Sequence, residues 1–101
     1  MDIEYEFDSS KNLKLRMQRG VGLDGMVALI ENGHVIRVYD HPNQETYPGQ
    51  RVYEVELEGY IWQVPHIQQA NTVRLITCYP CRKATKQWKK KETSDDEEKD
   101  I

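Results

Sequence analysis

Apolar and polar positions follow two different periods along the chain, which predicts helices first and strands afterwards. Residues 3–7 alternate apolar side chains with acids, as a short strand with one solvated face does. Apolar residues then recur three and four positions apart over 9–18 and 23–32, and from residue 34 they alternate with a period of two. The later strands are predicted over 34–40, 51–57, 60–67 and 72–79.

Capping signals mark the two ends of the first helix. Asp8 can accept backbone N–H hydrogen bonds at its start. Gly20 suits the left-handed residue that follows a helix. Leu13 and Met17 stand four residues apart, so we expect them on one side of this helix.

The clearest alternation lies in strand 51–57. Its two faces carry apolar residues and acids respectively: Tyr53, Val55 and Leu57 against Glu54 and Glu56. Glu58 and Gly59 then predict a tight hairpin. Pro65 cannot donate a hydrogen bond to a neighbouring strand, which predicts that the return strand ends at an edge or a bulge.

This order of elements predicts an α+β fold: two N-terminal helices packed on a four- to five-stranded, mainly antiparallel sheet, with a basic C-terminal helix that starts near Pro80. The 101 residues suffice for one domain, which we place at 1–91. Residues 92–101 are polar and charged, and we expect them to be disordered. No apolar run is long enough to span a bilayer and no secretory signal is visible, so the expected compartment is the cytoplasm, without membrane contact.

The formal charge of -3 is the sum over two neighbouring segments of opposite charge and the rest of the chain. Residues 92–101 hold six acids and one lysine, which leaves 13 basic and 11 acidic groups in the first 91 residues. Within that part, residues 82–91 hold six basic groups and no acid. Such a run indicates contact with an anion such as RNA, and a solvated basic helix is the plainer alternative.

Several motifs carry a resemblance to a known family. The segments YEFDSSKN, RGVGLDGM and VRLITCYPCRKATKQW, with four strands between them, resemble the BrnT-type toxins of bacterial toxin–antitoxin pairs. The segment DHPNQETYPGQRVYEVELEGYIWQVPHI, with RKATK, is similar to a BrnT-related subgroup of uncharacterised small proteins. The resemblance covers about residues 5–88. This chain departs from the subgroup at Cys81, where a small residue such as Ser is usual, at His66, where an aromatic is common, and in its acidic tail.

The resemblance implies a RelE-like fold and a ribonuclease that uses no metal or other cofactor. Such cleavage needs a base for the 2′-hydroxyl proton, cations for the charged phosphorane and an acid for the leaving 5′-oxygen. RelE-like folds place these groups on the open sheet face and the adjoining C-terminal segment. The candidate catalytic residues are His41 and His66 as base or acid, with Arg74, Arg82 and Lys83 as cations.

The basic helix supplies the candidate RNA contacts. Arg82, Lys86 and Lys90 fall on one helix face, which suits phosphate. The candidate RNA-binding residues are Lys86, Lys89, Lys90, Trp88 and Tyr79. Trp88 could stack on a base, but packing of the helix onto the sheet is the preferred interpretation.

Each of the other candidates also has a structural interpretation. The ring of His41 precedes a proline in a loop and could fix the turn by hydrogen bonding. His66 stands where an aromatic is common, which favours packing. Arg74 could pair across the sheet with Glu54 or Glu56.

Cys78 and Cys81 form a C-x-x-C pair that precedes the basic helix. A zinc site needs two more ligands, and His41 and His66 do not stand at zinc-finger spacing. A redox dithiol would suit a strand-to-helix turn, but the chain lacks a βαβ thioredoxin pattern. We prefer the interpretation that both are small packed residues.

Three functions follow from these observations. The first is a toxin-like endoribonuclease, as a homodimer or in a hetero-oligomer with a cognate antitoxin, which in BrnT-like systems is a ribbon-helix-helix protein. The second is a non-catalytic RNA- or protein-binding module on the same fold, because a fold does not imply a function. A thiol-redox protein is a distant third.

Overall fold

The computed structural model of the chain describes the backbone of residues 2–99 and the side chains of residues 2–91. The fold is α+β, as predicted, and the described residues form three helices and a mainly antiparallel, open sheet of six strands. The elements in chain order are β1 (Glu4–Glu6), α1 (Ser9–Arg19), α2 (Leu23–Glu31), β2 (Val35–Asp40), β3 (Arg51–Leu57), β4 (Tyr60–Gln69), β5 (Thr72–Leu75), β6 (Tyr79–Pro80) and α3 (Arg82–Lys99). In the described part of the chain, no helix is both long and apolar enough to cross a membrane.

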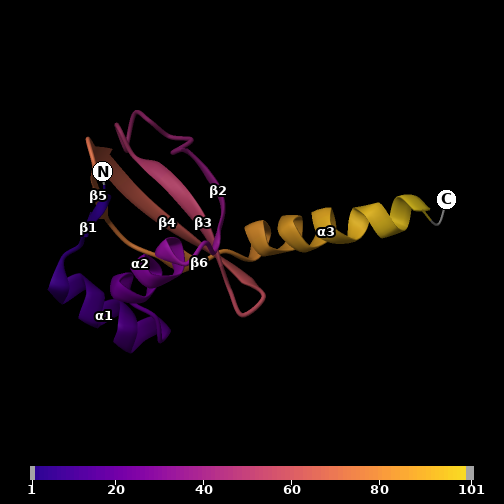
Figure 1. The fold of residues 1–101 in the computed structure, drawn as a ribbon, viewed down its shortest axis with the longest axis horizontal. Coiled ribbons are helices and arrows are strands. Elements are labelled where there is room, and N and C mark those ends of the chain that lie inside the picture. The colour runs from indigo at the N-terminus through magenta and orange to yellow at the C-terminus, as the bar shows by residue number, and fades with distance from the viewer. Residues whose placement is uncertain (1, 100–101) are drawn as a thin grey trace.

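The sheet has the strand order β1-β5-β4-β3-β2, with β6 also paired to β4. Only the contact between β1 and β5 is parallel among the strand pairs of the described residues. α1 and α2 lie together beside the sheet, and α3 extends away from it (Figure 1). The described backbone continues α3 to Lys99. The side chains of the predicted tail 92–101 lie outside the described residues, so the division into a domain at 1–91 and a disordered tail stays a prediction.

The predicted caps of α1 are confirmed. The Asp8 carboxylate accepts hydrogen bonds from the N–H groups of Ser10 and Lys11 at 2.8 and 3.1 Å. Gly20 follows the helix with φ 81°, a left-handed conformation that glycine adopts without steric cost. α2 is capped from α1, because Asn12 Oδ1 accepts the Asp24 N–H at 3.0 Å.

The buried side of α1 is not the side that carries Leu13 and Met17. These two residues are 58% and 80% exposed, whereas Leu15 between them is buried in the main core. Leu15 packs there with two residues of α2, Leu23 and Met26. The spacing of Leu13 and Met17 correctly placed them on one side of a helix, but tertiary packing turned that side to solvent.

The alternation along β3 is confirmed for the core. Val55 is fully buried, and Tyr53 and Leu57 pack against the same cluster. This face continues across the sheet through Trp62 and Val64 of β4. α1 and α2 cover it, so the second face, which carries the alternate side chains, is left for α3 and for solvent.

The predicted strand 72–79 is interrupted. Residues 76–78 are not in a strand, and they separate β5 from the two-residue β6. Pro65 lies inside β4, which runs beyond the predicted strand 60–67 to Gln69. Its carbonyl accepts the Ile76 N–H at 2.9 Å, so the edge of Pro65 that lacks an N–H faces the interruption.

α3 begins against the second face of the sheet. The Ile61 N–H of β4 donates a hydrogen bond to Thr85 Oγ1 at 2.8 Å, and that hydroxyl donates to the Cys81 carbonyl at 2.8 Å. Ala84 and Thr85 are buried at this contact. Because Ile61 precedes the core residue Trp62 in β4, its side chain points to the opposite face from α1 and α2.

Candidate functional site

Glu54 of β3 is buried on the sheet face that α3 adjoins. The alternation placed this acid on the face opposite Val55, and only 6% of Glu54 is exposed. Tyr39 Oη and Gln63 Nε2 both donate hydrogen bonds to Glu54 Oε2, at 3.1 and 3.0 Å. Arg37 Nε lies 3.3 Å from Glu54 Oε1. A buried carboxylate is costly unless it is paired, and these three partners account for its burial.

The register of the sheet brings these residues into one row, which we call the Glu54 cluster. Arg37 of β2 is opposite Glu54 of β3, which is opposite Gln63 of β4. Tyr39 follows Arg37 by two positions, so it lies on the same face. The Arg37 guanidinium carbon is 4.5 Å from the centre of the Tyr39 ring, and Gln63 Nε2 also donates to Tyr39 Oη at 3.0 Å. The four side chains therefore hold one another in place.

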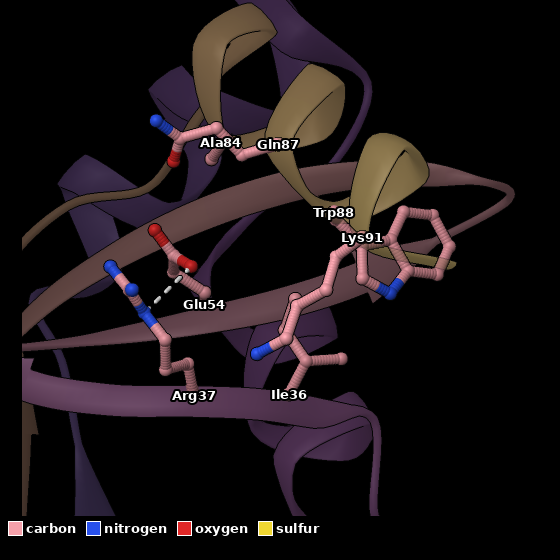
Figure 2. A pocket seen from close by; sticks show the side chains of 7 residues that line it. All are labelled: Ile36, Arg37, Glu54, Ala84, Gln87, Trp88 and Lys91. Atoms are coloured by element: carbon pink, nitrogen blue, oxygen red, sulfur yellow. Dashed lines mark ion pairs between the residues drawn. The ribbon is translucent and has the colours of Figure 1, made fainter. Parts of the chain in front are cut away.

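Two hollows of about 270 and 320 Å³ lie between the Glu54 cluster and α3. Four residues line both: Arg37, Glu54, Ala84 and Gln87. The first hollow extends to Ile36, Trp88 and Lys91, and the second to Tyr39, Pro42, Gln63, Cys81 and Lys83. Figure 2 shows the first, with the Arg37–Glu54 pair at one end and the Trp88 indole at the other. The cluster is thus reachable from solvent beside the basic helix.

The electrostatics of the Glu54 cluster keep a proton on Tyr39. Burial raises the pKa of Tyr39 above its ordinary value of 10.0, and the charge and hydrogen bond of Glu54 raise it further. Arg37 acts in the opposite direction. At neutral pH Tyr39 is therefore a hydrogen-bond donor that is held against a carboxylate.

The predicted cations of α3 differ in their position relative to the Glu54 cluster. Lys83 lines the second hollow. The remaining predicted cations of the helix are on its exposed surface: Arg82, Lys86, Lys89 and Lys90. Trp88 is half-buried and lines the first hollow, so it both packs the helix and presents part of its ring.

Tyr79 lies beside the Glu54 cluster. It is opposite Gln63 in the pairing of β6 with β4, and it therefore shares the face of that residue. It is half-buried, and burial raises its pKa. The structure thus brings Tyr79 and Lys83 together with a cluster that the sequence did not reveal.

His41 lies in the loop between β2 and β3, where its ring stabilises the turn. Its Nδ1 accepts the Asn43 N–H at 3.0 Å, and the ring centre is 4.4 Å from that of Tyr47. The Gln44 side chain completes this loop by donating to the His41 carbonyl at 2.9 Å. These contacts favour the turn-fixing interpretation of His41.

His66 lies on the other face of the sheet. It is fully buried and stacks on Tyr53, with ring centres 3.8 Å apart. Its Nδ1 is 3.0 Å from the Val64 carbonyl, which can only accept, so Nδ1 carries a proton. The other nitrogen, Nε2, makes no hydrogen bond with the described residues. The sheet therefore separates His66 from Lys83 and from the Glu54 cluster.

Arg74 pairs with Glu6, at 3.7 Å, and not with Glu54 or Glu56. This corrects the predicted cross-sheet pair, and the reason is the parallel pairing of β1 with β5, which places Glu6 opposite Arg74. Arg74 is also opposite Ile67, four residues from Gln63 along β4. At about 3.3 Å per residue, that is roughly 13 Å along the strand from the Glu54 cluster.

The two cysteines have different environments. Cys78 is buried in the core, and burial raises the pKa of its thiol to about 11, which disfavours the reactive thiolate. Cys81 is half-buried at the start of α3, where its Sγ accepts the Ala84 N–H at 3.4 Å. Among the side chains that the structure describes, no three His, Cys, Asp or Glu residues form a group that could hold a metal ion. Packing roles therefore fit both cysteines best.

Sequence reasoning missed Arg37, Tyr39 and Gln63, and it considered Glu54 only as a possible partner of Arg74. One signal was available. Arg37 and Tyr39 alternate in their strand as Glu54 and Glu56 do in theirs, which indicates a polar row across the sheet. The register that selects Arg37 as the partner of Glu54 depends on the ten-residue loop 41–50, and local patterns do not determine it.

Comparison with known proteins finds no family model that matches the chain, and no curated protein or solved structure that is significantly similar to it. The α+β class therefore rests on this structure, and the resemblance to BrnT-type toxins stays a prediction.

Proposed function

We propose that this protein is a toxin-like, metal-independent endoribonuclease that cleaves RNA by attack of the 2′-hydroxyl on the adjoining phosphate. One observation carries the proposal. The Glu54 cluster holds a carboxylate, a guanidinium and a phenol within hydrogen-bond or ion-pair distance of one another. It lies beside a helix whose first ten residues include six lysine or arginine residues and no acidic residue.

The three chemical roles of this reaction match the residues of the cluster. Glu54 is the base that takes the 2′-hydroxyl proton. Arg37, with Lys83 from α3, stabilises the negative charge that develops on the phosphorane. Tyr39 is the acid that protonates the leaving 5′-oxygen, because its raised pKa keeps its proton at neutral pH. The products are a 2′,3′-cyclic phosphate and a 5′-hydroxyl.

The proton balance closes within the Glu54 cluster. Glu54 gains one proton from the 2′-hydroxyl, and Tyr39 loses one to the leaving oxygen. Because Tyr39 Oη is already 3.1 Å from Glu54 Oε2, the proton on Glu54 can pass to Tyr39 and restore both groups. Gln63 is a positioning residue, since it donates one hydrogen bond to each.

The direct test is cleavage of a defined single-stranded RNA in the presence of a metal chelator. We expect the wild-type chain to produce 2′,3′-cyclic phosphate ends. Glu54→Gln should lower the rate about 100-fold or more, in the range of general acid–base catalysis. The matched control is Glu45→Gln, an exposed acid in the loop 41–50, which should cleave like the wild type.

Growth of a bacterial host tests the toxin-like role. Expression of the wild-type chain should arrest growth with decay of total RNA, and co-expression of the adjacent small gene, which we expect to encode a ribbon-helix-helix antitoxin, should relieve it. Arg82→Ala with Lys83→Ala should abolish the arrest. Normal growth with intact RNA, from folded and well-expressed protein, contradicts the proposal.

A non-catalytic RNA-binding module is the second candidate. The hydrogen bonds that Glu54 already accepts favour it. Its Oε2 already accepts two hydrogen bonds, and the residue is 6% exposed, so a 2′-hydroxyl must displace a partner to reach it. Measuring both RNA cleavage and RNA binding by the wild-type chain distinguishes the two functions. RNA binding without cleavage by the wild type selects this candidate.

A further inference from the structure

The hollow beside Trp88 has two chemically different ends. Ile36, which is 41% exposed, and the half-buried Trp88 form an apolar end. Arg37, whose side chain is 60% exposed, lies with Glu54 at the other end. Figure 2 shows that the two ends are joined by side chains of α3 and β2, with Gln87 and Lys91 along the helix.

The packing of α3 on the sheet buries only part of the Trp88 indole. The buried contact of α3 is made one turn earlier by Ala84 and Thr85, and Thr85 is fixed by its hydrogen bond from Ile61. Trp88 follows Ala84 by four positions, on the same helix face, and leaves part of its ring over the hollow. An indole and an exposed isoleucine that line one hollow offer a surface that a flat, apolar ligand can cover.

We infer that this hollow binds one unpaired nucleotide of RNA, with its base against Trp88 and Ile36 and its phosphate toward Arg37. The inference rests on the proposed function and specifies its substrate as single-stranded. A base in a duplex is stacked on both faces and offers no face to an indole, whereas an unstacked base does. A protein side chain would also fit the apolar end, but the basic run 82–91 beside it favours a polyanion.

The hollow has room for one base. Its volume of about 270 Å³ is below that of most drug-sized ligand sites. Gln87 adds an amide that can both donate and accept, as the edge of a base requires. The base would therefore be held next to the Glu54 cluster, which places the adjoining phosphate near the proposed reacting groups.

The test is the affinity of the full chain for a single-stranded oligouridylate and for a duplex RNA of the same length. Trp88→Ala should weaken binding of the single strand about tenfold, the equivalent of about 1.4 kcal/mol, within the range for one stacked base. Binding of the duplex should change little. Trp88→Phe should retain most of the affinity, because a phenyl ring still stacks. Met17→Ala, an exposed apolar residue of α1, is the matched control and should bind like the wild type.

A fluorescence measurement covers the case in which Trp88→Ala does not fold. Trp62 is buried, so quenching of indole emission by oligouridylate in the wild-type chain reports on Trp88, and it should vanish in Trp88→Phe. An equal loss of single-strand and duplex affinity in Trp88→Ala contradicts the nucleotide site, and so does RNA binding by the wild-type chain without quenching. Neither result contradicts the proposed function. A wild-type chain that binds no RNA overturns both. Unchanged affinity in a folded Trp88→Ala chain assigns the hollow to another partner.

Discussion

Arg37 and Glu54 face each other across β2 and β3, with Arg37 Nε 3.3 Å from Glu54 Oε1. The two partners differ in their surroundings, because the Arg37 side chain is 60% exposed and that of Glu54 only 8%. The arginine therefore connects a buried carboxylate to solvent. This asymmetry makes the pair suitable both for stabilising the sheet and for meeting a phosphate.

Removal of Arg37 should destabilise the fold. Arg37→Met should lower the free energy of unfolding by about 1–2 kcal/mol, less than the loss of a fully buried pair, because the exposed side of the arginine is screened by water. Urea unfolding measures the change. Arg74→Met, which removes an exposed pair with Glu6, is the control and should change stability by less than about 1 kcal/mol. An equal effect of both substitutions would show that the burial of Glu54 does not depend on Arg37.

Docking of α3 should depend on the Thr85 hydroxyl. Thr85→Val leaves the buried Ile61 N–H without a partner and should cost about 1–3 kcal/mol. Amide exchange should accelerate at Ile61, and RNA cleavage should fall as Lys83 and Trp88 lose their positions. Thr85→Ser keeps the hydroxyl and should restore the protection of Ile61. Slow exchange at Ile61 in Thr85→Val would contradict this role.

Acid should destabilise the protein through His66. Burial lowers the pKa of His66 below its ordinary value of 6.5, although the hydrogen bond to the Val64 carbonyl acts in the opposite direction. Protonation would also create a buried Nε2–H donor without a partner among the described residues. The unfolded chain therefore binds the proton more readily. The stability is complete above about pH 6.5 and is lost as the pH falls below it, by at most about 1.4 kcal/mol per pH unit.

The variant His66→Phe isolates this contribution. A phenyl ring can keep the stacking on Tyr53 but does not titrate. The carboxylates titrate in both proteins, so the difference between the two stability curves belongs to His66. Thermal unfolding between pH 7.5 and 5 should show a shallower fall for the variant. Parallel curves would mean that the folded protein accommodates the charged imidazole.

The two sides of α1 should respond differently to substitution. Leu15→Ala opens a cavity in the core and should cost about 2–5 kcal/mol. Leu13→Ala removes an exposed side chain and should change the stability by less than about 0.5 kcal/mol. Urea unfolding of the two variants compares them directly. Similar losses would place Leu13 at an unrecognised contact.

Elements whose signals are local could be predicted from the amino-acid sequence. The caps of α1 come from Asp8 and Gly20, and the hairpin between β3 and β4 comes from Glu58 and Gly59, both of which have positive φ. The alternation of β3 likewise separated Val55 from Glu54 before any partner strand was known. These features depend on hydrogen bonds and dihedral angles among neighbours in the chain, which a short stretch of sequence specifies.

Which distant residues contact one another depends on the packing of the whole fold. In the folded protein Arg37, and not Arg74, is the partner of Glu54. Leu15, and not Leu13, packs in the core, and His66 lies on the sheet face away from α3. Each outcome depends on strand register or helix rotation between segments that are distant in sequence. Several registers satisfy the same local pattern, and the lowest free energy among them is reached only when the buried carboxylate is paired and the core is filled at the same time.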